Sequence, residues 1–311
     1  MKGNDYMDEK KKIYSLMVTC TLFWAGAFIA GKVGVKEIPP FSLAFFRFLF
    51  ATAIIFPIMI KYEKKDWKLK KADFPSIIFL GVVGMFGYHV LFFTALKYTT
   101  AINSSMIAAT NPLITSIIAS ILIGEMLDQK RLGALLLALT GVFMTITNGQ
   151  IEVIRTIDFN IGDIIMLGAV VCWAAYSVVS KKVMPKYSPL IITSYSFLVC
   201  LVGLIPFVIY EKPMTYLPNV TWKGWASVIY MAVFASVIGY LVQQISIKAI
   251  GPSKTMAFIN LVPVFSIILS VLILGESITF IKILSATIII TGVYINSTLK
   301  NINSKVGVLN K

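Results

Sequence analysis

Charged residues are scarce in this chain. Only 14% of its 311 residues are Asp, Glu, Lys or Arg, and 58% are hydrophobic; an average soluble domain is about a quarter charged. The charges are separated by apolar stretches of about twenty residues, the length that a helix needs to cross a bilayer. These proportions exclude a soluble domain. They predict an all-α integral membrane protein that crosses a cell membrane many times, of the bacterial inner or plasma membrane type.

Cysteine, histidine and buried carboxylates are also rare. Cys20, Cys172 and Cys200 all fall inside apolar stretches, so no disulfide framework is implied. His89 is the only histidine, and no Asp or Glu lies deep in an apolar stretch. The chain therefore lacks the clusters that bind metals and the paired carboxylates of many enzymes. We expect no metal, no cofactor and no enzymatic activity.

Acidic residues are half as numerous as basic ones, 14 against 28. In a soluble chain this excess would suggest a nucleic-acid partner. Here the lysines are interpreted as topology determinants and lipid-headgroup partners, because they lie between apolar segments. The predicted partners are the lipid bilayer and a small-molecule substrate, without nucleic acid.

What the chain has in abundance is apolar segments, and ten are predicted to span the membrane. Most Lys and Arg residues fall on one side if the N-terminus, the loops after the even-numbered segments and the C-terminus share that side. Both termini are therefore predicted to be cytoplasmic. The segments are about 13–33, 42–60, 74–96, 101–123, 130–148, 160–180, 189–210, 223–247, 253–274 and 279–298.

The second half of the chain repeats the first. Trp24 matches Trp173 at an offset of 149 residues, and Pro112 matches Pro263 at an offset of 151. Each half has five predicted helices, an odd number, so the second enters the membrane from the opposite face. Such inverted repeats are typical of secondary transporters, whose substrates bind between the repeats near the midplane. The predicted divisions are a cytoplasmic N-terminus (1–12), a first repeat (13–148), a linker (149–159), a second repeat (160–298) and a cytoplasmic tail (299–311).

Several motifs resemble the EamA family of the drug/metabolite transporter superfamily. They include FWAGAFIAGK, PPFSLAFFRFLFA, NPLITSIIASILIGE and VPVFSIILSVLILGESIT, and the likeness spans 13–298. The resemblance implies a ten-helix exporter of metabolites, amino acids or drugs, in which the fifth and tenth helices are peripheral.

Two prolines, Pro112 and Pro263, lie inside predicted helices. An interior proline lacks the N–H for its own helix bond and clashes with the carbonyl four residues earlier, here Ala108 and Ile259. We interpret both prolines as hinges for alternating access; the alternative is a static kink. Buried amides near the prolines need a partner or a cavity. Asn103, Asn111 and Asn260 are therefore candidates to bind substrate or to bond neighbouring helices.

Further candidates lie in other apolar segments. His89, an ionisable group inside a membrane helix, is a candidate substrate ligand or proton carrier, unless it is a neutral packing residue. This leaves the proton open as a coupling ion. Arg47 is interpreted as snorkelling or structurally paired in preference to binding a substrate carboxylate. The other substrate-binding candidates are Trp24, Trp173, Tyr176, Tyr240 and Gln243.

Taken together, these features predict a secondary-active transporter that exports small metabolites, amino acids or amphipathic drugs by alternating access. Alternatives are a passive channel or facilitator and, less favoured, an integral membrane enzyme acting on lipid-linked groups. The sequence leaves open the substrate, the direction of transport and the choice between monomer and homodimer.

Overall fold

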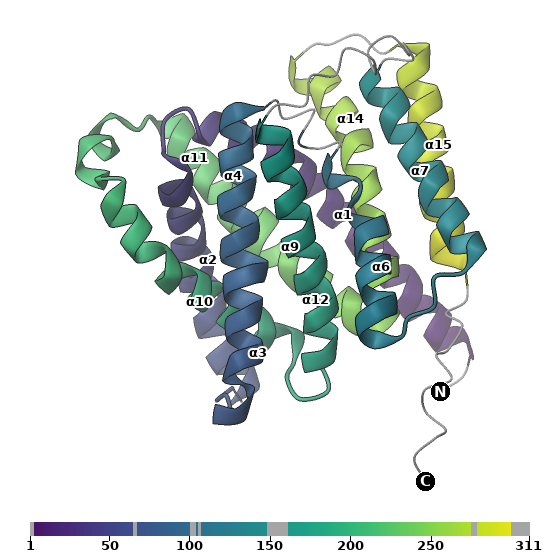
Figure 1. Ribbon diagram of the computed structural model, residues 1–311, viewed down its shortest axis with the longest axis horizontal. Helices are drawn as coiled ribbons and strands as arrows, with labels where there is room; N and C mark the ends of the chain where they lie inside the picture. Colours follow the sequence, from purple (N-terminus) through teal and green to yellow (C-terminus); the bar gives the residue numbers. More distant parts are fainter. Residues whose placement is uncertain are drawn as a thin grey trace.

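The computed structural model describes residues 3–64, 67–99, 104, 107–147, 161–274 and 279–299. Within these ranges the chain is helical with short connections and contains no strand (Figure 1). Six of its helical spans are long and apolar enough to cross a membrane. The all-helical prediction is confirmed, whereas the count of ten crossings stays a prediction. The six spans are Lys11–Gly34, Pro40–Glu63, Lys71–Tyr98, Ile161–Val183, Pro189–Tyr210 and Trp222–Ile250.

The individual helices follow the predicted apolar segments closely. In the first repeat they are α1 (Gly3–Gly34), α2 (Pro40–Glu63), α3 (Phe74–Phe79), α4 (Tyr88–Tyr98), α6 (Asn111–Ile123) and α7 (Gln129–Thr147). In the second they are α9 (Ile161–Val183), α10 (Pro189–Tyr210), α11 (Trp222–Tyr230), α12 (Gly239–Ile250), α13 (Pro252–Ala257), α14 (Val262–Leu274) and α15 (Phe280–Thr298). Short 3₁₀ turns are η1 (Lys71–Asp73), η3 (Pro213–Thr215), η4 (Leu217–Asn219) and η6 (Phe258–Leu261).

The third membrane segment of each repeat contains a π-helical stretch at the equivalent place. In the first repeat η2 (Leu80–Gly87) joins α3 to α4, and in the second η5 (Met231–Ile238) joins α11 to α12. The two stretches begin 151 residues apart, the offset of the prolines. A π-helical stretch is uncommon and often marks a functional site. The repeat is therefore visible in backbone geometry as well as in sequence.

The second helices of the two repeats, α2 and α10, pack together and run antiparallel. At one end the Glu211 carboxylate, just after α10, accepts bonds from Ser42 N (2.8 Å) and Ser42 Oγ (2.6 Å) at the start of α2. At the other end Ser188, the N-cap of α10, donates to Glu63 at the end of α2. Each helix thus ends beside the start of the other.

The last helices, α7 and α15, also pack together and lie at one edge of the bundle (Figure 1). They cross at equivalent glycines. A Cβ on Gly141 would lie 2.8 Å from Ile289 Cγ1, and one on Gly292 would lie 2.7 Å from the backbone nitrogen of Ala138. Since Gly141 contacts residues before Gly292 and Gly292 contacts residues before Gly141, these helices are antiparallel too. Their place at the edge agrees with the peripheral position that the family resemblance implies.

The first helices exchange partners between the repeats. Helix α1 of the first repeat packs against α11, η5, α12 and α14 of the second, and α9 packs against α4, η2 and α6 of the first. The bundle therefore contains two groups of helices, each drawn from both repeats. We call them the α1 group (α1, α11, α12, α14) and the α9 group (α9, α3, α4, α6).

The two groups are joined at opposite ends by equivalent lysines, which we call the lysine clamps. Lys32 near the end of α1 donates from Nζ to the carbonyls of Leu96 (2.7 Å) and Thr99 (2.8 Å) at the end of α4. Lys181 near the end of α9 donates to Ile247 (2.9 Å) and Lys248 (2.8 Å) at the end of α12. A cation is favourable there because the last carbonyls of a helix lack intrahelical partners and carry partial negative charge.

The prolines stand at breaks between helices, which corrects the expectation of an interior kink. The chain turns at 109–110, and α6 begins at Asn111, so Pro112 is the second residue of a new helix. Pro263 is likewise the second residue of α14, after the 3₁₀ turn η6. Proline is tolerated at a helix start because its missing N–H is not needed there. The broken segments contact one another, since α6 packs against α13 and η6.

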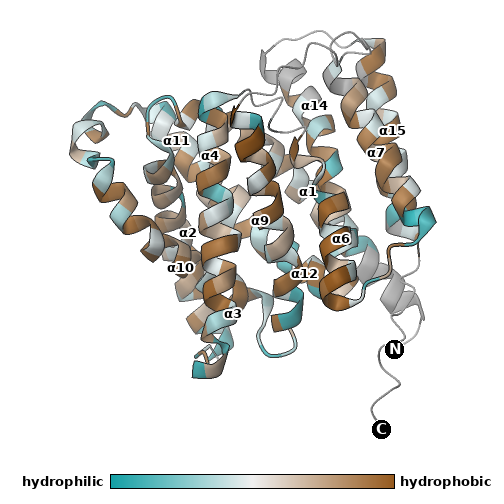
Figure 2. Cartoon of the chain, in the orientation of Figure 1, coloured by the Kyte–Doolittle hydropathy of each residue, from teal (hydrophilic) through white to brown (hydrophobic). Residues whose placement is uncertain are grey.

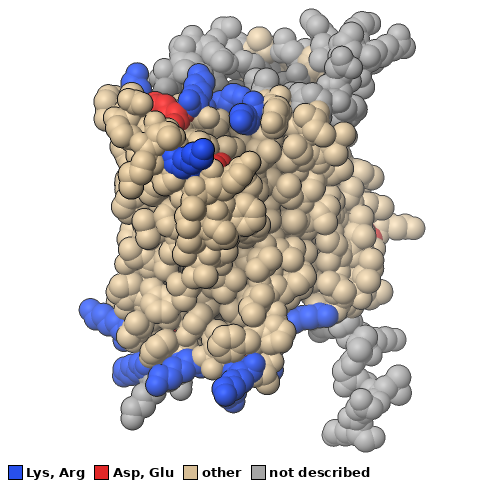
Figure 3. All heavy atoms as spheres, turned by 60° about the vertical axis from the view of Figure 1, so that its left-hand side comes forward, with Lys and Arg blue, Asp and Glu red and all other residues tan. Residues whose placement is uncertain are grey.

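Exposed charge gathers at the two ends of the helices. Hydrophobic residues cover the middle of the helices in Figure 2. On the face shown in Figure 3, Lys and Arg side chains gather in two bands separated by a broad region almost free of charge. This is the surface expected of a protein whose middle lies in hydrocarbon.

Candidate functional site

Two tryptophans from equivalent positions meet at the centre of the bundle. Trp24 on α1 and Trp173 on α9 are 5% and 3% exposed, and their rings lie edge to face with centroids 5.3 Å apart. Trp24 donates from Nε1 to the carbonyl of Ala235 in η5 (3.2 Å), and Trp173 donates to Oε1 of Gln243 on α12 (3.3 Å). The two repeats therefore touch here through the same residue type.

The equivalent pair His89 and Tyr240 lies beside the tryptophans. His89 Nδ1 is 2.8 Å from the carbonyl oxygen of Met85 in η2, and His89 Nε2 is 3.4 Å from the Tyr240 hydroxyl. Because a carbonyl can only accept, Nδ1 carries the proton, and the unprotonated Nε2 accepts from Tyr240. The imidazole is fully buried, and these are the roles of the two nitrogens in its neutral form.

Both π-helical stretches supply a carbonyl to this centre: Met85 accepts from His89, and Ala235 accepts from Trp24. The stretches also allow close packing, because a Cβ on Gly84 would lie 2.4 Å from the ring of Tyr176. Sequence reasoning missed the π-helical geometry. Small residues at the repeat offset, Gly84 matching Ala235, were its only signal.

Between the two groups of helices lies an enclosed cavity of about 20 Å³, room for roughly one water molecule. Aromatic side chains make up most of its wall, with one cation. The lining residues are Trp24, Ala27, Phe28, Arg47, Tyr88, Phe92, Trp173, Tyr240, Ile259 and Val262. Three predicted site residues, Trp24, Trp173 and Tyr240, are thus brought together around one space.

Arg47 on α2 is the charged member of this wall, and of the two roles predicted for it, snorkelling and structural pairing, its position fits the second. It is only 4% exposed, so its guanidinium does not reach a headgroup region. Its Nε donates to the hydroxyl of Ser236 in η5 (2.7 Å), and the guanidinium carbon lies 5.8 Å from the centre of the Phe48 ring. Sequence reasoning placed Arg47 six residues into a helix but could not tell which way it points.

Two of the predicted polar residues, Asn111 and Gln243, bond neighbouring helices, and a third, Tyr176, packs against one. Asn111 donates to the carbonyl of Val170 (3.2 Å) and accepts from Thr115 (3.0 Å). Gln243, besides accepting from Trp173, donates to Ser177 (3.2 Å). Tyr176 is fully buried and packs against Tyr240. Asn111, Gln243, Tyr176 and His89 surround the cavity without lining it.

Two amides and the prolines complete the predicted set. Asn260 in η6 is fully buried, and its side-chain amide has no hydrogen-bond partner among the described residues. Its neighbour Ile259 lines the cavity. Asn103 lies outside the described residues. Pro112 and Pro263 are buried at the helix breaks, and their role as hinges stays a prediction.

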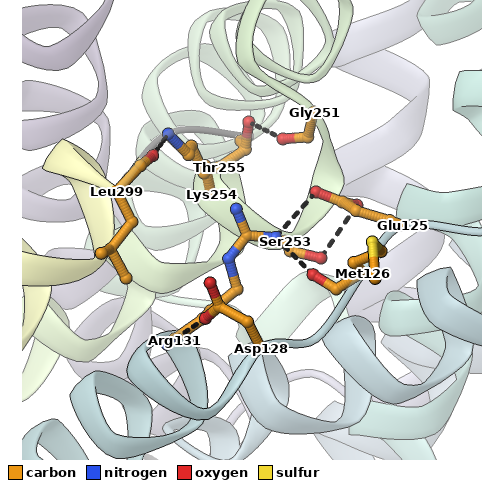
Figure 4. Close-up of polar contacts among 9 residues, drawn as sticks. All are labelled: Glu125, Met126, Asp128, Arg131, Gly251, Ser253, Lys254, Thr255 and Leu299. Carbon is orange, nitrogen blue, oxygen red and sulfur yellow. Dashed lines mark hydrogen bonds and ion pairs between the residues drawn. The ribbon is translucent and has the colours of Figure 1, made fainter. Parts of the chain in front are cut away.

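A polar cluster joins the end of α6 to the start of α13 (Figure 4). Glu125 pairs with Arg131 (3.3 Å) and accepts from the Ser253 hydroxyl (2.9 Å). Asp128 accepts from the backbone nitrogen of Arg131 (2.7 Å) and so caps the start of α7. Glu125 therefore links the two repeats, whereas the neighbouring Asp128 accepts a hydrogen bond from a free backbone N–H at the start of α7.

No group of three or more His, Cys, Asp or Glu side chains suitable for a metal occurs in the part of the chain that the structure describes. What the centre offers chemically is hydrogen bonding, aromatic surface and one positive charge.

Comparison with known proteins gives consistent matches over almost the whole chain. The sequence model of the EamA-like transporter family matches residues 11–147 and 160–298. An uncharacterized transporter of Bacillus subtilis, YyaM, is 36% identical and aligns over 90% of this chain and 92% of its own length. An uncharacterized transporter of Archaeoglobus fulgidus is 30% identical, over 92% of this chain and 97% of its own.

A more distant relative carries a more specific name. A protein named as a probable amino-acid metabolite efflux pump of Salmonella typhimurium is 24% identical over 93% of this chain and 95% of its own length. One solved protein structure superposes with a TM-score of 0.72 at 20% identity, covering 92% of this chain and 96% of that one. At this identity the superposition supports the fold alone.

Proposed function

The chain belongs to the EamA-like transporter family, and on that premise we propose that it is a secondary-active exporter of small metabolites, amino acids or amphipathic drugs. The observation that carries the proposal is the contact of Trp24 with Trp173. Equivalent residues of two repeats meet beside an enclosed cavity. This is where transporters with inverted repeats bind their substrates.

The proposed topology has ten membrane crossings with both termini in the cytoplasm. The antiparallel pairs α2/α10 and α7/α15 support an inverted arrangement of the repeats. In this orientation the Lys32 clamp lies at the outer face, and the Lys181 clamp and the Glu125 cluster lie at the cytoplasmic face.

The proposed mechanism is alternating access by movement of the α1 group against the α9 group. Both lysine clamps are closed here and the cavity has room for about one water molecule, which corresponds to an occluded conformation. Release of the Lys181 clamp would open the site to the cytoplasm, and release of the Lys32 clamp would open it to the outside. The helix breaks at Pro112 and Pro263 are the proposed hinges.

The proton is the proposed coupling ion, with His89 as its candidate carrier. Protonation at Nε2 would turn this nitrogen from acceptor to donor and so reverse its bond with the Tyr240 hydroxyl. Tyr88 packs against the same imidazole, as does Phe48, the neighbour of Arg47. A proton on His89 would therefore act directly on the aromatic wall of the cavity.

Transport by the purified full chain in liposomes tests the proposal. Liposomes preloaded with an unlabelled amino acid or metabolite should take up the labelled compound by saturable counterflow. The matched control is the double variant Glu125→Cys/Ser253→Cys, bridged by a short bifunctional thiol reagent. Bridging should stop counterflow, and reductant should restore it. Unsaturable conductance would contradict a carrier and favour a passive channel.

A further inference from the structure

The charge of Arg47 has no anionic partner in the described part of the chain. The ion pairs found there are Arg131 with Glu125 and Lys186 with Asp73. The one hydrogen-bond partner of Arg47 is the neutral hydroxyl of Ser236, which uses Nε alone. Since a guanidinium has five N–H donors, four remain for another partner.

A buried charge without a counter-charge is costly, and in membrane proteins such residues mark functional sites. Arg47 is the only charged residue in the described wall of the cavity, and six aromatic side chains surround the same space. Its position in the second repeat is taken by Ser196, which carries no charge. The centre of the bundle therefore has one cationic pole, on the side of the first repeat.

We infer that the cavity binds a small organic carboxylate with an apolar or aromatic body, and that Arg47 is its counter-charge. The inference rests on the proposed transporter function and specifies its substrate class. A guanidinium matches a carboxylate with two parallel hydrogen bonds. The rings of Trp24, Trp173 and Tyr88 supply flat apolar surface for the body of the substrate. The same charge disfavours cationic drugs.

The size of the cavity fits this assignment only if the helices move. About 20 Å³ accommodates a water molecule and not a carboxylate with a ring. The wall includes residues of α1 and of α9, which belong to different groups of helices. Separation of the groups would widen the space while leaving Arg47 on α2 in its wall.

Binding of matched compounds to the purified full chain tests the inference. The probes are 3-phenylpropionate, its neutral amide and 3-phenylpropylamine, which share a body and differ in charge, together with inorganic phosphate. Affinity is measured by thermal unfolding and by tryptophan fluorescence, because Trp24 and Trp173 lie in the wall. The acid should bind about tenfold to a hundredfold more tightly than the amide, the range expected for hydrogen bonds to a charged group. The amine and phosphate should bind more weakly still.

Variants of Arg47 test whether the preference for the acid depends on this residue. Arg47→Gln should remove the preference for the acid and leave the affinity for the amide unchanged, while Arg47→Lys should keep part of the preference. Lys36→Gln removes an equal charge at an exposed position and should behave as wild type. If Arg47→Gln fails to fold, the affinities of the wild type for acid, amide and amine still test whether the cavity prefers a carboxylate.

Equal affinity of the wild type for acid and amide would overturn the inference, as would a preference that survives Arg47→Gln. Phosphate binding as tightly as the acid would overturn the assignment to an organic substrate. Failure of the transporter proposal looks different: the acid would bind in an Arg47-dependent way, but liposomes would show no counterflow. Saturable counterflow of cationic compounds that is insensitive to Arg47→Gln would leave a transporter and remove the carboxylate assignment.

Discussion

The two repeats share a scaffold but differ at the centre. Equivalent lysines close the two ends, and equivalent glycines let α7 and α15 cross. Around the cavity the chemistry diverges: Arg47 corresponds to Ser196, and His89 corresponds to Tyr240. The repeats therefore share a symmetric scaffold, while the charge of Arg47 and the imidazole of His89 come from the first repeat alone. Substitutions at equivalent positions should have equal effects in the scaffold and unequal effects at the centre.

The largest effect is expected at the glycines where α7 and α15 cross. Gly141→Leu and Gly292→Leu would each drive a side chain into the backbone or side chains of the opposite helix. Each should destabilise the protein by about 3 kcal/mol, the upper end of overpacking costs. Gly133→Leu on the same helix α7 is the control, because a Cβ there would meet nothing within 4 Å. Thermal unfolding in detergent measures all three, and a large difference between Gly141→Leu and Gly292→Leu would break the equivalence.

The second largest effects are expected at the lysine clamps. Lys32→Gln and Lys181→Gln each remove two charge-assisted hydrogen bonds to helix ends. Each should slow transport about tenfold, as expected for losing bonds to a charged group. Their effects on accessibility should be opposite. Lys32→Gln should expose the cavity to a membrane-impermeant thiol reagent at one face, and Lys181→Gln at the other. Exposure at the same face in both variants would refute the paired-gate account.

His89 is one of the residues by which the centre of the first repeat differs from that of the second, where Tyr240 takes its place. His89→Tyr makes the two repeats alike at this position and removes the bond to the Met85 carbonyl. Transport should fall several-fold and lose the pH dependence that a titrating histidine provides. Tyr240→Phe, which removes the hydroxyl partner alone, is the matched comparison. A wild-type pH profile in His89→Tyr would exclude His89 as the proton carrier.

The smallest effects are expected at two equivalent residues of opposite charge. Glu37 accepts from Thr221 N (2.7 Å) at the start of α11, and Lys186 pairs with Asp73 at the start of α3. Glu37→Gln should cost about 1 kcal/mol, as for loss of a helix cap. Lys186→Gln should lower the unfolding temperature less, by an amount that high salt reduces, because the Lys186 side chain is exposed.

The pH dependence of the Lys186 contribution has a definite sign. The Asp73 carboxylate raises the pKa of Lys186 above its ordinary value, by hydrogen bonding and by its charge. The contribution is therefore complete below the unfolded pKa and is lost only as pH rises through the raised folded pKa. Between pH 6 and pH 9 the difference between Lys186→Gln and wild type should stay constant. A difference that disappears within this range would show that another group is responsible.

The features that could be predicted are those with a direct signal in the sequence. Hydrophobic length located the helices, and α10 (Pro189–Tyr210) begins and ends where it was predicted. The repeat offset identified Trp24 and Trp173 as equivalent candidates for the site, but it did not predict their contact. Hydrophobic length and the repeat offset can both be read directly from the composition and spacing of the sequence.

The failures concern direction and backbone geometry. Arg47 is buried because α2 packs against η5 at that point. The rotation of α2 about its axis depends on this packing, which could not be read from the sequence. Pro112 stands at the start of a helix because the chain turns just before it. The polar pair Thr110 and Asn111 is the signal for this turn, but the prediction includes it in one continuous membrane helix. The π-helical stretches depend on tertiary contacts such as that of Gly84 with Tyr176.

The central claim is that the two groups of helices move against each other about the centre, and distances between spin labels test it most directly. Exposed positions Met126 and Lys248 report on the proposed cytoplasmic face, and Lys36 and Lys97 report on the proposed outer face. Each pair joins the α1 group to the α9 group. In liposomes, addition of a transported substrate should lengthen one distance and shorten the other. Distances that lengthen together, or that stay fixed while transport proceeds, would contradict alternating access.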